Sequence, residues 1–364
     1  MDLSRLTVPA LGLAVGLVLA DSSVVILALP DILDQFKVSI DDVSWVLTLF
    51  NLVMALAAVP AAYLARRHAP GVVCTAGLVV FAAASLLCAA APSFGVLLAA
   101  RALQAAGGAL AVCSALELLP ALTGSERRAA VIWAAAGGIG AAAGPAIGGA
   151  LTDAISWQAI FAVQVPLAVA ALVAVPRHVP APVIDPPGRP ALAANAALGL
   201  LSAALTAALF LVVLLLINGW GHSPIEAAAI VSVMPLAAIA TLRLAPTGSA
   251  PARIRAGAGA ILIAGGLFAL SLLPDAAWGW LVPPQIAIGA GLALSIGALT
   301  EDALRGRSPL AIHGGWTIAS RHAGVCIGLL ILTPIFTNDL ADQQRAAEAA
   351  GTRIILSSKL SLNA

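Results

Sequence analysis

Residues 134–151 read AAAGGIGAAAGPAIGGAL, an apolar stretch that contains six glycines and one proline. In water, a glycine destabilises a helix interior by roughly 1 kcal/mol and a proline by roughly 3 kcal/mol relative to alanine. In a lipid bilayer the same small residues let neighbouring helices pack closely. Gly140, Gly144 and Gly148 recur every four residues and therefore share one face of such a helix. We expect this face to contact another helix, either as a static packing seam or as a functional interface.

The composition of the whole chain indicates the same solvent. Of its 364 residues, 61% are hydrophobic and only 10% are charged, whereas a soluble domain is typically about 25% charged. The net charge of +1 argues against a nucleic-acid partner, which would need a concentrated basic face. The four cysteines are isolated in apolar runs, so we predict neither a disulfide framework nor a metal site. The chain is therefore expected to be a polytopic membrane protein.

Eleven apolar segments are long enough, at about 20 residues, to cross a bilayer. Helices are expected in all of them because backbone polar groups in lipid must be hydrogen-bonded within the segment. The fold class is therefore all-α. The expected spans are 7–30, 43–65, 71–91, 94–119, 129–152, 157–175, 191–217, 225–244, 255–273, 281–300 and 312–337.

The positive charges indicate an orientation. With the N-terminus in the cytoplasm, the inside loops carry twelve arginines, and the outside loops up to residue 337 carry only Lys37. This asymmetry follows the positive-inside rule. Sixteen arginines against two lysines favour a GC-rich bacterial genome. We therefore expect a multi-pass protein of a bacterial plasma (inner) membrane.

A proline-rich segment divides the chain into two parts. Residues 176–190 contain six prolines, which predicts an extended cytoplasmic linker. It separates an N-terminal six-helix half, residues 1–175, from a second half with five helices, residues 191–337, and a polar extracytoplasmic tail, residues 338–364. A two-half architecture calls for a twelfth helix, so we expect the sequence to be truncated.

Two opposite charges lie away from the ends of the expected helices. Asp21 is nine residues before Pro30, and Arg101 is seven residues into the fourth helix. At 1.5 Å per residue, both lie roughly 10–14 Å from the outer edge of the membrane. A charge exposed to lipid at mid-membrane costs about 2.5–3.5 kcal/mol, so we predict a buried ion pair, with Gln104 one turn further along the same helix.

This pair has two interpretations. Burial favours the protonated form of a carboxyl group, whereas a neighbouring guanidinium favours the carboxylate. Asp21 could therefore exchange a proton as the protein changes state, with Arg101 as its partner. The alternative is a static ion pair that fixes helix packing.

Three more polar residues lie inside expected spans. Glu117, near the cytoplasmic end of the fourth helix, either extends to the membrane surface or lines an inner cavity with Gln104. Arg321 and His322 lie nine to ten residues into the last helix, where we assign Arg321 mainly to packing.

The glycine-rich stretch, GGIGAAAGPAIGG (137–149), resembles the glycine–proline signature on the fifth helix of antiporters in the major facilitator superfamily. In that family the signature lies between the two halves and is associated with exchange. ADSSVVILALP (20–30) and LLAARALQAAGGAL (97–110) resemble the family's acidic signature on helix one and its Arg-x-x-Gln-Gly motif on helix four, so the resemblance is to the drug:proton antiporters, or multidrug efflux type. The signature positions on the fifth helix are Gly140, Gly144, Pro145, Gly148 and Gly149.

One motif departs from the family pattern. The loop AAYLARRHAPG (61–71) has Arg66, followed by Arg67, where the family has an aspartate that helps to latch the cytoplasmic gate. An arginine has the opposite charge, so we expect an altered gate at these residues.

The resemblance implies a major facilitator fold with two pseudo-symmetric halves. It implies a monomeric, proton-coupled antiporter that exports a small amphiphilic or drug-like solute by alternating access. Its partners would be the solute, protons and the lipid bilayer, with the proton gradient as energy source and no cofactor. The alternative is a degenerate, non-transporting receptor or assembly partner, which the altered loop and the odd helix count favour. An enzyme is not expected, because the sequence has no H-E-x-x-H, G-x-S-x-G or P-loop motif.

Overall fold

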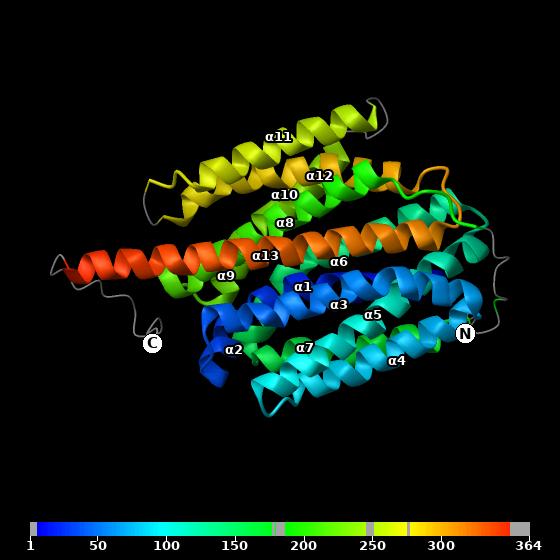
Figure 1. Cartoon of the computed structure of the whole chain (residues 1–364), viewed down its shortest axis with the longest axis horizontal. Helices are drawn as coiled ribbons and strands as arrows, with labels where there is room; N and C mark the ends of the chain where they lie inside the picture. The colour runs from blue at the N-terminus through cyan, green and yellow to red at the C-terminus, as the bar shows by residue number, and fades with distance from the viewer. Residues whose placement is uncertain (1–5, 177–178, 180–185, 245–250, 275–276, 350–364) are drawn as a thin grey trace.

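The computed structural model describes residues 6–176, 179, 186–244, 251–274 and 277–349, and these residues form helices and connecting turns without a strand. The helices run roughly side by side in one bundle (Figure 1). We call α1 to α7 the N-terminal group and α8 to α13 the C-terminal group. The N-terminal group comprises α1 (Thr7–Ile26), α2 (Leu29–Phe36), α3 (Ile40–Arg67), α4 (Pro70–Ala89), α5 (Phe94–Thr123), α6 (Glu126–Ala154) and α7 (Trp157–Val173).

The C-terminal group begins after the expected linker. It comprises α8 (Leu192–Leu214), the π-helical turn η2 (Leu215–Gly219), α9 (Pro224–Val231), α10 (Val233–Leu244), α11 (Ala252–Leu270), the 3₁₀ turn η3 (Trp278–Leu281), α12 (Val282–Leu304) and α13 (Leu310–Ala349). In Figure 1, α4 and α11 lie at opposite sides of the bundle, and α13 runs along the middle, next to the N-terminal group. Most of the linker, residues 177–178 and 180–185, and the final segment 350–364 lie outside the described residues.

Within the described residues, nine helical segments are long and apolar enough to cross a membrane. They coincide with nine of the eleven expected spans. The other two expected spans also coincide with helices, but α7 has only 17 residues and α13 is not among the nine. The prediction of an all-helical membrane protein is confirmed.

Two helix boundaries differ from the prediction. The first expected span, 7–30, ends at Ile26, and α2 starts at Leu29 with Pro30 in its first turn. Proline has no N–H group to continue a helix, but it fits the first turn of a new one, which explains the break. At the other end, α13 continues past residue 337, where the last helix was expected to stop, to Ala349.

Serine caps start several of these helices. The side chain of Ser39 accepts a hydrogen bond from the backbone N–H of Asp42, and the Asp42 carboxylate accepts one from the backbone N–H of Ser39. Ser93 caps α5 and Ser125 caps α6 through their side-chain oxygens. Helix α5 ends at Gly124, whose φ of +67° is a left-handed conformation that glycine adopts without steric cost. These caps fix where the spans begin and end.

Glycine allows the closest helix contacts. A Cβ atom added to Gly140 would overlap the backbone carbonyl oxygen of Gly16, and one added to Gly148 would overlap that of Val24. Helices α1 and α6 therefore touch backbone to backbone. Four further helix pairs approach in the same way, at Gly77 and Gly107 (α4–α5), Gly199 and Gly324 (α8–α13), Gly259 and Gly291 (α11–α12), and Gly289 and Met234 (α12–α10).

The N-terminal and C-terminal groups contact one another mainly along two pairs of helices. Helix α13 packs along α3, where Gly315 approaches the backbone oxygen of Ala58. Helix α6 packs against α9, where Gly149 approaches Ala228. These two glycine contacts lie towards opposite ends of the bundle, because Ala58 is in the second half of α3 and Gly149 is close to the end of α6.

Candidate functional site

A buried ion pair joins α1 to α5, as the sequence predicts. Arg101 donates a hydrogen bond from Nη1 to Oδ2 of Asp21 over 2.5 Å. Both side chains are 0% exposed. Their pairing confirms the predicted geometry, since neither charge is left alone in the apolar interior.

Two glutamines extend this pair into a network. Gln164 of α7 donates from Nε2 to the second oxygen of Asp21, Oδ1, over 2.8 Å. Gln104 accepts from Arg101 through Oε1 at 2.5 Å and donates from Nε2 to Oε1 of Gln164 at 2.6 Å. Ser85 of α4 accepts a second hydrogen bond from Gln104 at 2.9 Å. Four helices, α1, α4, α5 and α7, thus meet at one hydrogen-bonded cluster, which we call the Asp21 network.

Arg101 is held on its other sides by α3 and by two aromatic rings. Its Nε donates to the backbone oxygen of Val46 at 3.1 Å. Its guanidinium carbon lies 4.3 Å from the ring centre of Phe50 and 5.5 Å from that of Phe161, within the range of cation–π attraction. Its remaining nitrogen, Nη2, is buried without a hydrogen-bond partner. The guanidinium therefore retains one free donor group.

The chemistry of the network follows from counting donors. An ionised carboxylate only accepts hydrogen bonds, and here each oxygen of Asp21 receives one, from Arg101 and from Gln164. Protonation would remove the negative charge of Asp21 and with it the ion pair to Arg101, which would weaken the attachment of α1 to α5.

A second polar contact crosses between the two groups of helices. His322 of α13 lies with Nδ1 2.6 Å from Oδ1 of Asn51 on α3. Asn51 donates from Nδ2 to the backbone oxygen of Leu47, so its Oδ1 is an acceptor and His322 must be the donor. Ser22, next to Asp21 in the chain, also donates to Asn51 Oδ1, at 3.3 Å. The contact between the groups therefore lies one residue away from the Asp21 network.

Glu117, for which the sequence left open a position at the membrane surface or on an inner cavity, is largely buried and paired with an arginine. It accepts a hydrogen bond from Nη1 of Arg66 at 3.0 Å, and the two side chains are 10% and 7% exposed. Arg66 lies in the last turn of α3, and the neighbouring Arg67 is exposed. The reversed charge in the loop motif is thus matched by an acid on α5.

The glycine signature on α6 is divided between two partners. Gly140, Gly144 and Gly148 pack against α1, within the N-terminal group, and Ser23 of α1 donates to the backbone oxygen of Ala141 at 3.0 Å. Gly149 alone among the signature glycines approaches α9 of the C-terminal group. The expectation that the signature lies between the halves is therefore wrong for most of it, because the small residues face the neighbouring α1. Pro145 is buried within the helix.

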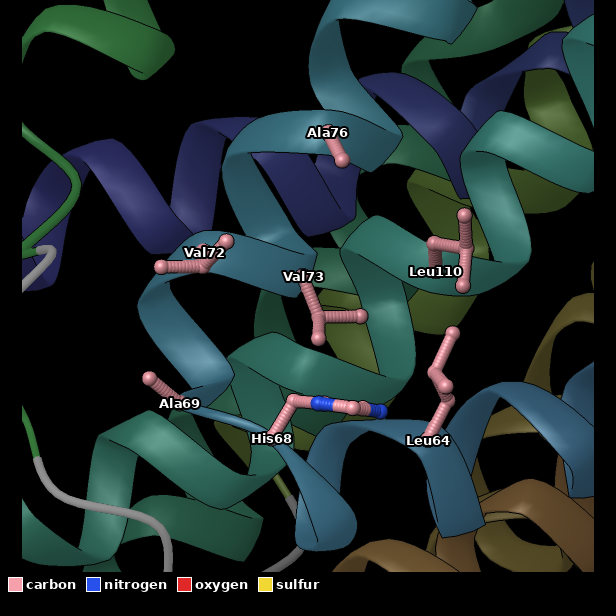
Figure 2. A pocket seen from close by; sticks show the side chains of 7 residues that line it. All are labelled: Leu64, His68, Ala69, Val72, Val73, Ala76 and Leu110. Carbon is pink, nitrogen blue, oxygen red and sulfur yellow. The ribbon is translucent and has the colours of Figure 1, made fainter.

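A pocket of about 490 Å³ lies elsewhere, over the turn between α3 and α4. Its lining is apolar apart from His68, whose ring points towards Leu64 in Figure 2. Leu64 and Val72 on its rim are exposed, which places it on the outer, lipid-facing surface of the helices. None of the predicted site residues lines it, so it is not the predicted site.

Sequence reasoning missed Gln164 and Ser85 as site residues. Both are polar and buried within apolar helices, and such a position in a membrane span was the available signal. Among the described residues, no three histidine, cysteine, aspartate or glutamate side chains gather into a metal site.

The fold and this buried network define the class of protein: an all-helical, multi-pass membrane protein with ionisable groups inside the bundle. The family model of the Major Facilitator Superfamily matches residues 11–337. The chain therefore belongs to the Major Facilitator Superfamily.

Relatives in this family include multidrug efflux proteins. The multidrug resistance protein Stp of Mycobacterium tuberculosis is 36% identical over 165 residues, which cover 44% of this chain and 31% of Stp. The multidrug efflux pump LfrA of Mycolicibacterium smegmatis is 38% identical over 173 residues, covering 47% of this chain and 34% of LfrA. These matches thus span about a third of the length of the relatives.

The fold is also that of a solved transporter. The crystal structure of a bacterial homologue of the human lysosomal transporter Spinster, in an inward-facing and unoccupied conformation, superposes with a TM-score of 0.69. The match covers 96% of this chain and 87% of that chain at 17% identity. The chain therefore shares its fold with this transporter.

Proposed function

We propose that this protein is a proton-coupled antiporter that exports a small amphiphilic or drug-like solute by alternating access. The observation that carries the proposal is the sealed Asp21 carboxylate, held by Arg101 and Gln164 at the junction of four helices. Intramembrane acids of this kind form proton relays in transporters. Protonation of Asp21 would neutralise its ion pair with Arg101 and so weaken the contact between α1 and α5, which connects proton binding to helix movement.

The arrangement of close helix contacts supports two related halves. Counted as membrane segments, α1, α4, α5 and α6 are the first, third, fourth and fifth of the N-terminal group, and α8, α11, α12 and α13 have the same ranks in the C-terminal group. Glycine contacts join α1 to α6 and α4 to α5, and equivalent ones join α8 to α13 and α11 to α12. Such internal repeats are typical of transporters in which one half rocks against the other.

The Arg66–Glu117 pair bears on the alternative of a degenerate, non-transporting receptor. That alternative rested partly on the missing aspartate in the loop after α3. A hydrogen-bonded pair at the same end of α3 supplies another connection between α3 and α5. The altered loop is therefore compatible with a working gate.

We further propose that the protein lies in a bacterial inner membrane with its N-terminus in the cytoplasm. Arginines support this orientation at the ends of α3 and α12 and at the starts of α6 and α11. Because successive helices cross the membrane in opposite directions, these four helix ends lie on the same side of the membrane. Fusion of a periplasmically active reporter after Lys37 and after Arg67 would test it. We expect activity only after Lys37.

The function is tested in proteoliposomes with three dansyl probes that share a fluorophore, namely cationic dansylcadaverine, anionic dansylglycine and neutral dansylamide. We expect movement of at least one probe against its gradient when a pH gradient is imposed, and loss of this movement when nigericin collapses the gradient. The Asp21→Asn variant should keep probe exchange at equal pH but lose gradient-driven accumulation. Undiminished accumulation in Asp21→Asn would overturn the coupling role. Movement of no probe in the wild type would favour the receptor.

A further inference from the structure

Arg321 differs from Arg101 and Arg66 in having no ion-pair partner among the described residues. Asp21 pairs with Arg101, and Glu117 pairs with Arg66. Arg321 lies eleven residues into α13, roughly 17 Å from the start of that helix. In the part of the chain that the structure describes, no acidic side chain pairs with Arg321 and its guanidinium makes no hydrogen bond.

The helical pattern places Arg321 on the inward side of α13. Gly314, Ile318, Arg321 and Val325 recur at intervals of four, three and four residues and so share one face. On this face, Gly314 approaches Leu116 of α5, and Ile318 and Val325 are buried in the core. The opposite face of α13 carries exposed apolar side chains, namely Trp316, Ile327, Leu330 and Ile331.

The depth of Arg321 in the bundle is that of the Asp21 network. Its neighbour His322 contacts Asn51, which also receives a hydrogen bond from Ser22. One turn from Arg321, Thr317 donates to Oδ1 of Asn195 on α8 at 3.1 Å. Arg321 lies on the face of α13 that points between the two groups of helices. It is half-buried, so part of its side chain remains accessible.

An unpaired guanidinium at this depth is costly, and ionisable residues inside a membrane mark substrate or ion pathways. Arginine cannot escape the cost by deprotonation. Its planar fork binds carboxylate, sulfonate and phosphate groups through paired hydrogen bonds. Among the described residues of this region no acid is left for Arg321, because Asp21 is already paired with Arg101.

We propose that Arg321 binds the negatively charged group of the transported solute, so that the preferred substrate is an amphiphilic anion. This inference rests on the proposed transport function and names the substrate class of that function. The anion would lie between α13, α5 and α8, where the two groups of helices meet. Its apolar part would face the apolar side chains that surround the site.

The test is equilibrium binding to the full chain in phosphatidylcholine nanodiscs, with empty nanodiscs as the partition control. The probes are dansylglycine and dansylcadaverine, which differ in charge. We expect dansylglycine to bind about tenfold more tightly than dansylcadaverine, since a charged hydrogen-bonded contact contributes at least that factor. In Arg321→Gln, dansylglycine affinity should fall by about tenfold, with dansylcadaverine unchanged and Arg321→Lys intermediate.

A matched control is Arg128→Gln, which removes an exposed arginine at the start of α6 and should bind as the wild type does. Equal binding of both probes by the wild type, or undiminished dansylglycine binding by Arg321→Gln, would overturn the proposal. Should Arg321→Gln fail to fold, competition on the wild type decides. Octanesulfonate should then displace dansylglycine and octyltrimethylammonium should not, and the reverse result would contradict an anion site.

Binding is measured without a pH gradient, so this test does not depend on proton coupling. Loss of anion affinity in Arg321→Gln together with undiminished coupling in Asp21→Asn would keep the anion site and reject the proposed coupling. Loss of coupling in Asp21→Asn with no charge preference in binding would keep the proposed coupling and reject the anion site. The two proposals can therefore fail separately.

Discussion

At the scale of single residues, the Asp21 network shows how a membrane span holds a charge. The ion pair alone would leave one carboxylate oxygen and most of the guanidinium without partners. Gln164, Val46 and two aromatic rings supply the remaining contacts. Buried ion pairs need such additional hydrogen bonds, because removing two charges from water costs more than their attraction alone returns.

Gln164→Met tests the contribution of the amide. The change would leave Oδ1 of Asp21 and one N–H of Gln104 buried without partners, so we expect a loss of about 1–3 kcal/mol in stability. The measurement is thermal unfolding followed by tryptophan fluorescence. The control is Gln158→Met, one helix turn and a half earlier, where an exposed hydrogen bond to Gln35 is lost and the change should stay within about 0.5 kcal/mol. Equal effects of the two variants would show that the network is not specifically stabilising.

The pair of Arg66 and Glu117 can be tested by exchanging its charges. Arg66→Glu and Glu117→Arg each place like charges together in a largely buried position, so each should lower the unfolding temperature and transport. The double variant restores an ion pair and should recover most of the loss, with a coupling energy of about 0.5–3 kcal/mol. Additive losses in the double variant would mean that the two side chains do not act together.

At the scale of helices, small residues decide which helices touch. Gly16 on α1 and Gly140 on α6 bring two backbones together without an intervening side chain. Sequence periodicity predicted the glycine face correctly, since spacing by four residues is a local property. It could not predict that this face meets α1 rather than the other half, because the partner of a helix is set by the packing of the whole bundle.

Gly140→Ala and Gly138→Ala form a matched pair on this helix. The methyl group at residue 140 would overlap the backbone of Gly16, so we expect a loss of about 1–3 kcal/mol through overpacking. At Gly138 no atom lies within 4 Å of an added Cβ, and alanine should raise helix stability by up to about 1 kcal/mol. The measurement is the unfolding temperature in detergent, which should fall in Gly140→Ala and rise in Gly138→Ala. A stable Gly140→Ala protein would show that α1 and α6 separate without cost.

At the scale of the whole molecule, the contacts between the two groups of helices are the ones that the proposed alternating access would break. The pair α3–α13 is one of them. Cysteines at residues 62 and 315 would be close enough to form a disulfide, since an added Cβ on Gly315 lies 3.1 Å from that of Ala62. In a background without the four native cysteines, oxidation of this pair should stop transport, and reduction should restore it.

The matched control for that experiment lies within one group. An added Cβ on Gly12 lies 3.9 Å from that of Ala136, so cysteines there would join α1 to α6 inside the N-terminal group. Oxidation of this second pair should leave transport largely intact, because rigid-body rocking does not separate these helices. Full transport by the oxidised 62–315 pair would contradict movement between α3 and α13.

The sequence by itself determined the solvent, the positions of the helices and the ion pair. Hydropathy, proline and serine caps are local signals, and two opposite charges at similar depth have few other ways to avoid lipid. Only the tertiary structure decided the rest: that Gln164 completes the Asp21 site, that Glu117 pairs with Arg66, and that no acid among the described residues pairs with Arg321. Each of these depends on which side chains of distant helices meet, and helix packing in a bilayer is set by close shape fit rather than by hydrophobicity, which sequence patterns report.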